Sequence, residues 1–252
     1  MKNTIRRISL VMSALLVVAV ISFTDFGGAQ AAPPPKTAPF AKVFQANANG
    51  AIISIGNSLL TCPDTAGQPC VDGRAGGAWD NNDYRMVHLD VDADASTYNS
   101  SSSQLNLPDG AQVLFAGLYW GARLDAGSQG VKGDPDQAQF IKLKVPGDSA
   151  YQDIEGTVVA QNGGQKNAYQ SYKDITGIVK AAGNGDYWGA NVNAGTGLDR
   201  YAGWALTVVY SAPSLPLRNL TVFQGFETVG SGYPQDIEVS GFLAPETGQV
   251  DA

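Results

Sequence analysis

Residues 113–120 carry an uninterrupted apolar run, Val-Leu-Phe-Ala-Gly-Leu-Tyr-Trp. Successive side chains of a β-strand point to opposite faces of the sheet, so a strand with this composition is apolar on both faces. Such a strand is stable where other parts of the protein cover it from both sides. The run therefore predicts a central strand inside a layered β-fold.

Other segments show the patterns of further strands. Residues 140–145 alternate apolar residues with Lys142 and Lys144, which predicts that both lysines point to solvent. Further strands are expected over residues 40–46, 52–55, 84–91, 153–159, 187–192, 204–210, 220–229 and 237–242. Because glycine, proline and asparagine turns separate them, the pattern predicts an all-β, jelly-roll-like β-sandwich of roughly ten strands over residues 40–244.

Two local signals refine this prediction. Asn49-Gly50 stands between apolar runs, and both residues tolerate positive φ, so the pair predicts a hairpin turn. One short helix is expected between Asp174, as its N-cap, and Gly183, as its C-terminal stop. Its apolar stripe would consist of Ile175, Ile178, Val179 and Ala182.

The N-terminus has the features of a secretory signal peptide over residues 1–31. Basic residues precede an apolar run of about 14 residues, shorter than the ~20 that span a bilayer. The small residues that follow predict cleavage between Ala31 and Ala32; an uncleaved membrane anchor is the alternative. Residues 32–39 are rich in proline and alanine and are expected to form a linker, and residues 245–252 a C-terminal tail.

Charge and the two cysteines limit the compartment and the partners. The chain has a net charge of −7, and removal of the signal peptide would make it more acidic. Nucleic acid and anionic membranes are therefore unsuitable partners. In an exported chain Cys62 and Cys70 predict one disulfide, which stabilises by roughly 2.5 kcal/mol. A redox or metal pair is the alternative, although the spacing is not Cys-x-x-Cys.

Several blocks resemble one family of surface proteins. They lie at residues 44–50, 56–62, 97–102, 113–122, 182–185, 195–204 and 218–225. Together they resemble the N-terminal β-domain of uncharacterised secreted and cell-surface proteins of actinobacteria and other Gram-positive bacteria, found ahead of repeat domains of unknown function. The resemblance implies an extracellular, adhesin-like setting, possible wall association and no catalytic residues. Residues 243–248 are similar to a sortase signal, but Ala244 interrupts the pattern.

Three acidic residues form a candidate calcium site. Asp90, Asp92 and Asp94 alternate, and in a loop their carboxylates could converge on Ca²⁺, which prefers oxygen ligands. In a strand, the same residues would instead form a solvated acidic edge. No other cofactor is expected.

A second candidate site contains aromatic and charged loop residues. Trp188, Asp199, Arg200 and Tyr201 lie in or beside glycine-rich segments. Aromatic rings with a carboxylate and an arginine nearby are suited to sugar binding, so the set predicts a glycan-binding site. The alternative is that these rings fold back onto the sandwich.

Two further residues, His88 and Lys42, could take part in catalysis or in a covalent cross-link, but each has a simpler explanation. His88 is the single histidine, and no nucleophile pairs with it in the sequence, so a structural role is expected. Lys42 could form a cross-link to an asparagine in a dry core, whereas an exposed lysine at a strand edge is the alternative.

These features predict a secreted, non-enzymatic cell-surface or adhesion-type module of unassigned ligand, with a glycan and a host or matrix protein as the candidate partners. A carbohydrate-binding or carbohydrate-active extracellular domain is the alternative, and a purely structural spacer is the third hypothesis.

Overall fold

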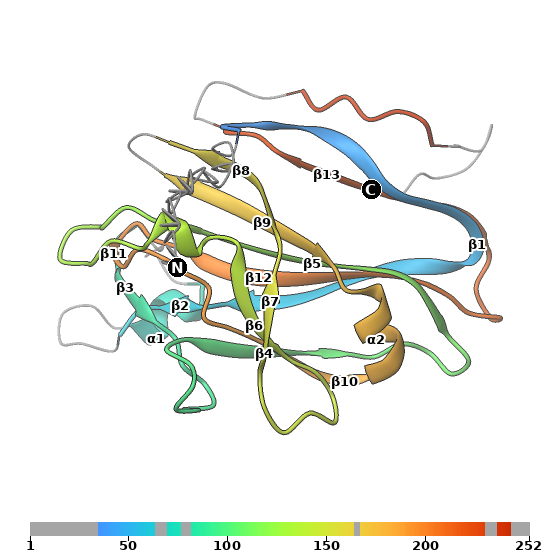
Figure 1. Cartoon of the computed structure of the whole chain (residues 1–252), viewed down its shortest axis with the longest axis horizontal. Helices are drawn as coiled ribbons and strands as arrows, with labels where there is room; N and C mark the ends of the chain where they lie inside the picture. Colours follow the sequence, from blue (N-terminus) through green and yellow to red (C-terminus); the bar gives the residue numbers. More distant parts are fainter. Residues whose placement is uncertain (1–34, 64–69, 77–81, 164–166, 230–235, 243–252) are drawn as a thin grey trace, which may run out of the picture. The chain divides into compact units, whose positions relative to one another are not determined.

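The fold is built from antiparallel β-sheets (Figure 1). The computed structural model describes residues 35–63, 70–76, 82–163, 167–229 and 236–242, all within one compact unit, Pro34–Ala252. This part of the chain contains thirteen strands, more than the roughly ten expected, and the predicted all-β, sandwich-like fold is confirmed. The predicted signal peptide, the cleavage site between Ala31 and Ala32 and the tail over residues 245–252 lie outside the described residues.

The largest sheet has six strands. Their order is β13 (Leu217–Phe226), β1 (Ala38–Ser58), β12 (Ala202–Ser211), β5 (Gln112–Arg123), β9 (Ala168–Asp174) and β8 (Thr157–Asn162). A four-stranded sheet has the order β4 (Ser100–Leu105), β10 (Gly185–Ala190), β6 (Phe140–Lys144) and β7 (Gln152–Glu155). A small sheet contains β11 (Gly197–Leu198), β3 (Arg85–His88) and β2 (Leu60–Thr61).

Strand β1 is continuous, so the hairpin predicted at Asn49-Gly50 is wrong. Its first half pairs with β13 and its second half, from Gly50 onward, pairs with β12. Figure 1 shows the strand curling back between these two halves. A Cβ atom at Gly50 would overlap the carbonyl oxygen of Tyr210, so glycine serves a close backbone approach here.

The fold-back of β1 covers the sheet on its second face. Phe115 of β5 and Val209 of β12 pack against Leu220 and Val222 of β13. The opposite face of β5, including Leu118 and Trp120, packs in the main core against the four-stranded sheet. The prediction that residues 113–120 are covered on both faces is therefore confirmed.

The predicted helix is present as α2 (Thr176–Ala182), and its apolar stripe faces the core as expected. The carboxylate of Asp174 accepts hydrogen bonds from the backbone N–H and the hydroxyl of Thr176, at 2.9 and 2.6 Å. The helix begins one residue later than an Asp174 N-cap requires, and Gly183 follows it with a φ of 70°. The strand expected over residues 237–242 is not formed.

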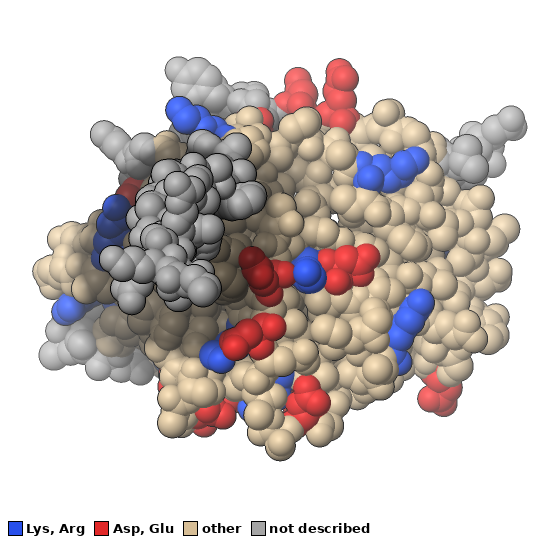
Figure 2. Space-filling view, viewed as in Figure 1, with Lys and Arg blue, Asp and Glu red and all other residues tan. Residues whose placement is uncertain are grey.

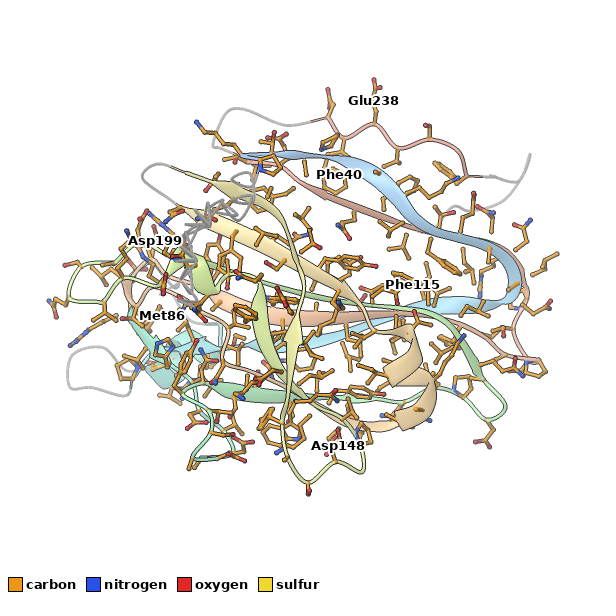
Figure 3. The ribbon with its side chains drawn as sticks, in the orientation of Figure 1. Phe40, Met86, Phe115, Asp148, Asp199 and Glu238 are labelled. Atoms are coloured by element: carbon orange, nitrogen blue, oxygen red, sulfur yellow. A yellow bond between two sulfur atoms is a disulfide. The ribbon has the colours of Figure 1, made fainter. Side chains whose placement is uncertain are left out.

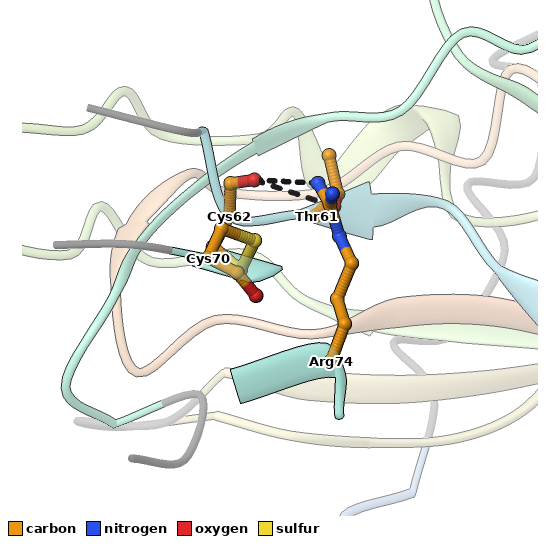
Figure 4. Close-up of a disulfide and its surroundings, with 4 residues drawn as sticks. All are labelled: Thr61, Cys62, Cys70 and Arg74. Atoms are coloured by element: carbon orange, nitrogen blue, oxygen red, sulfur yellow. Dashed lines mark hydrogen bonds between the residues drawn. A yellow bond between two sulfur atoms is a disulfide. The ribbon is translucent and has the colours of Figure 1, made fainter. Parts of the chain in front are cut away.

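Cys62 and Cys70 form the predicted disulfide, which joins the end of β2 to α1 (Cys70–Arg74) (Figure 4). The guanidinium of Arg74 donates to the carbonyl oxygen of Cys62 and to the hydroxyl of Thr61, both at 2.9 Å. These bonds hold the short helix α1 against the end of β2, next to the disulfide. No helix among the described residues is long and apolar enough to cross a membrane.

Candidate functional site

The outer face of the four-stranded sheet presents one row of side chains that includes a predicted site residue. The strand register places Trp188 of β10 opposite Ser102 of β4 on one side and Lys144 of β6 on the other. Tyr187, next to Trp188 in the chain, is buried in the core, because neighbouring residues of a strand point to opposite faces. Trp188 itself is only partly buried, on the outer face.

Lys144 lies at the centre of this site. Its ammonium nitrogen is 4.9 Å from the centre of the Trp188 ring and 4.5 Å from the centre of the Tyr151 ring. Both distances are within the range of cation–π attraction, about 6 Å. The same ammonium group donates to Oδ2 of Asp92 at 3.1 Å. Lys144 thus joins two aromatic rings and a carboxylate.

Asp92 fixes the geometry of the site. Its Oδ2 atom also accepts a hydrogen bond from the Tyr151 hydroxyl at 2.7 Å, and its Oδ1 atom lies 2.7 Å from Oγ of Ser100. Burial by itself would raise the pKa of Asp92. The hydrogen bonds from Ser100, Tyr151 and Lys144, and from the backbone of Asp94, outweigh burial and lower that pKa to about 2. The carboxylate is therefore charged and oriented at neutral pH.

The three aspartates of the predicted calcium site face different partners. Ser100 Oγ brings Asp90 and Asp92 together, since it also lies 2.8 Å from Oδ1 of Asp90. Asp94 instead accepts from the backbone and hydroxyl of Ser96, both at 2.8 Å. In the described part of the chain no group of three or more His, Cys, Asp or Glu side chains is arranged to hold a metal ion. Calcium binding stays a prediction, and the melting temperature with and without a chelator tests it.

The indole N–H of Trp188 differs from those of the buried tryptophans. The Trp120 indole donates to the carbonyl oxygen of Ala138 at 2.9 Å, and the Trp204 indole donates to Oγ of Ser101 at 3.0 Å. Within the described residues, no hydrogen bond from Trp188 is formed. Its N–H is therefore available to an external acceptor.

The other predicted sugar-binding residues lie elsewhere. Asp199 forms an ion pair with Arg123, and Tyr201 is 49% exposed. Figure 3 shows Asp199 beside β11, far from Asp148 in the β6–β7 loop that also carries Tyr151. No hydrogen bond, ion pair or ring contact among the described residues joins Trp188 to this group. The predicted set therefore divides into two separate places.

Arg200 has a structural position. It is 5% exposed, and its guanidinium donates to the carbonyl oxygens of residues 125, 126, 198 and 199. These carbonyls belong to two loops whose glycines approach so closely that a Cβ atom at Gly130 would overlap the carbonyl oxygen of Thr196. Arg200 thus holds two tightly packed loops together and does not present its charge to a ligand.

His88 and Lys42 also have protein partners. The His88 ring contacts Tyr98 edge-on, with 5.2 Å between ring centroids, and burial lowers the pKa of His88. Lys42 is exposed and donates to Oε1 of Gln45 at 2.6 Å and to the carbonyl oxygen of Gly241 at 3.3 Å. A lysine in this environment lacks the dry surroundings that the cross-link requires.

The sequence did not reveal the roles of Lys144, Tyr151 and Ser100. Lys144 was expected to point to solvent; it lies on the outer face of the sheet, but its side chain is only 19% exposed. Its partners Asp92 and Tyr151 come from loops before β4 and before β7, so only the folded chain brings them together. The pairing of residues 92, 144 and 151 has no local signal in the sequence.

Comparison of the chain with protein-family models, curated proteins and solved structures found no match. The resemblance to Gram-positive surface proteins therefore stays a prediction.

Proposed function

We propose that this chain is a secreted, non-enzymatic β-sandwich of the cell-surface or adhesion type, which holds a binding surface in a fixed shape. One observation carries the proposal: several polar side chains that could otherwise contact a substrate are hydrogen-bonded to backbone groups of the loops. Arg200, with its four carbonyl partners, is the main example. A surface held in this way loses little conformational entropy when it binds a partner.

Asparagine side chains act in the same way. Asn99 bonds to the backbone N–H and the carbonyl of Val192, at 3.2 and 3.0 Å. Asn184 bonds to both backbone groups of Leu107, each at 2.8 Å. Both contacts join segments far apart in the sequence, so they fix the loops of the sandwich relative to each other.

Two features support the extracellular setting. The disulfide between Cys62 and Cys70 is typical of proteins that fold in oxidising compartments. The first 31 residues read as a signal peptide that precedes the sandwich. The resemblance to actinobacterial and other Gram-positive surface proteins agrees with both.

A carbohydrate-binding or carbohydrate-active domain is the second candidate. Trp188 favours it, because a partly exposed tryptophan with a free N–H, beside a lysine and a tyrosine, provides ring stacking and hydrogen bonding at one place. Of the two forms of this candidate, a carbohydrate-binding domain needs only this arrangement and no catalytic step.

The test uses the chain purified from the medium of a bacterium that exports it. The protein is incubated with Gram-positive cell walls, with collagen and fibronectin, and with immobilised polysaccharides, and bound and released material is measured. We expect binding to at least one surface and no release of reducing sugar, whereas chain unfolded by heat and reduction does not bind. Failure to bind any surface, or turnover of a glycan, would contradict the proposal.

A further inference from the structure

We propose that the outer face of the four-stranded sheet around Trp188 binds a neutral saccharide. The site consists of Trp188, Ser102, Lys144 and Tyr151, with Asp92 as a positioning residue. This inference rests on the proposed function as a binding module, takes up its second candidate and restricts the ligand to a neutral saccharide on this face.

The residue directly opposite Trp188 on β4 is small. Lys144 lies over the ring from β6, whereas on β4 the opposite residue is Ser102, whose side chain is too short to cover an indole. Of the serines at residues 100–103, Ser102 is the one opposite Trp188, whereas the hydroxyl of Ser101 lies in the core, where it accepts from the Trp204 indole. The C–H groups of a pyranose ring can pack against the indole of Trp188, with the Ser102 hydroxyl beside it.

Hydrogen-bond donors surround the ring. The Trp188 N–H has no acceptor on the described part of the chain, and Lys144 has three N–H donors, of which Asp92 engages one. Asp92 also accepts the hydroxyl hydrogen of Tyr151, so it orients both side chains toward the same place. Sugar hydroxyls provide the acceptors that these donors need.

The charges of this face disfavour an anionic ligand. Lys144 pairs with Asp92, and Lys142 pairs with Asp153 at 2.8 Å, so neither lysine offers an unpaired positive charge. Asp90, joined to Asp92 through Ser100, adds a further negative charge. On the side of the molecule that Figure 2 displays, blue and red side chains likewise lie next to each other. An anionic ligand would be repelled by these carboxylates, whereas a polyhydroxylated neutral ligand would not.

The face also lacks the apolar area that a protein partner needs. The exposed large hydrophobic residues in the described part of the chain lie outside β4, β6, β7 and β10. A protein interface has a fully buried centre, usually with several aromatic anchors. One tryptophan among serines, lysines and carboxylates suits a sugar ring.

Binding is measured on immobilised neutral glucan, mannan and galactan. Polygalacturonate, chitosan and collagen serve as the charged-polysaccharide and protein comparisons. The change in tryptophan fluorescence on binding is a second readout. The variants are Trp188→Ala, Trp188→Phe and Ser102→Gln. Tyr201→Ala is the matched control, because it removes an exposed ring from the other predicted group. Thermal unfolding shows whether each variant is folded, and Ser102→Gln blocks the open side of the ring if Trp188→Ala does not fold.

We expect the wild-type chain to bind at least one neutral polysaccharide with a change in fluorescence. Trp188→Ala and Ser102→Gln should bind at least about tenfold more weakly, Trp188→Phe should retain part of the affinity, and Tyr201→Ala should bind as wild type. Unchanged binding by folded Trp188→Ala or Ser102→Gln would overturn the inference. Binding only to charged polysaccharides or to collagen would overturn it and leave the proposed function intact, while absence of all binding would reject both.

Discussion

The ring of Phe44 stacks on the ring of Phe115, with 5.2 Å between centroids and 24° between planes. Phe44 belongs to β1 and Phe115 to β5, which are not neighbours in the sheet. The contact exists because β1 and β13 fold back over the outer face of β5 and β12, as Figure 3 shows for Phe115. A second, smaller core therefore closes the face that a two-layer sandwich would leave open.

Phe115→Ala should remove the centre of this second core. Because Phe115 is 4% exposed, we expect the free energy of unfolding to fall by about 3–5 kcal/mol in a denaturant titration. Phe242→Ala is the control, since Phe242 is 38% exposed and should contribute much less. Equal losses from the two variants would mean that the fold-back does not bury Phe115.

Gly50→Ala should destabilise the bend of β1. The added methyl group would overlap the carbonyl oxygen of Tyr210, so we expect a loss of about 2 kcal/mol or more. Gly177→Ala is the matched control in α2, where a Cβ atom meets nothing within 4 Å. There the same change should be neutral or stabilise by about 0.5–1 kcal/mol. A Gly50→Ala chain as stable as wild type would contradict the close approach.

Asp92→Asn should change stability in a pH-dependent way. The pKa of Asp92 is lowered in the folded chain to about 2 from 3.8, so the charged form stabilises the fold above about pH 4 and loses this contribution between about pH 4 and pH 2. We expect the variant to be about 1–2 kcal/mol less stable at pH 7, and the difference to vanish near pH 2.

Asp153→Asn is the control for this prediction. Its side chain is 82% exposed, so loss of its ion pair with Lys142 should have little effect at any pH. Urea titrations of both variants at several pH values measure the two curves. A pH-independent difference for Asp92→Asn would show that the carboxylate charge is not what stabilises the site.

Arg200→Met should loosen the two loops that Arg200 joins. Four carbonyl oxygens lose the bond from Arg200, and of these the one of Asp199 keeps a bond from Arg123. We therefore expect a loss of about 3 kcal/mol and faster backbone hydrogen exchange in residues 123–133 and 193–199. Arg85→Met, at an exposed arginine of β3, is the control. Exchange that speeds up equally throughout the chain would indicate general destabilisation.

The fold was more predictable than the site, and the errors have physical reasons. The apolar run over residues 113–120 predicted burial on both faces because side-chain alternation is a local property. The hairpin prediction at Asn49-Gly50 was wrong because the missing Cβ atom, which lets glycine adopt positive φ in a turn, also lets it approach the carbonyl oxygen of Tyr210 in a continuous strand. Whether the chain forms a hairpin or a continuous bent strand here depends on the pairing of β1 with β12 and β13, which no local sequence pattern reveals.

The site was predictable only in part for the same reason. Trp188 stood out as an aromatic residue in a glycine-rich region, and Lys144 as an outward residue of a strand. Their contact depends on the register of β10 against β6, and the placement of Asp92 depends on Ser100. Arg200 was misread because a charged residue beside glycines looks exposed until its carbonyl partners are known.

The pairing of β1 with β13 also determines when the domain can form during synthesis. Ala38, at the start of the first strand, has Phe226, at the end of the last, as its partner. Until the segment that becomes β13 is available, residues 38–49 have an unpaired edge and the rings of Phe44 and Phe115 lack their cover. A chain that crosses a membrane N-terminus first would therefore keep this edge unpaired until nearly all of it had emerged.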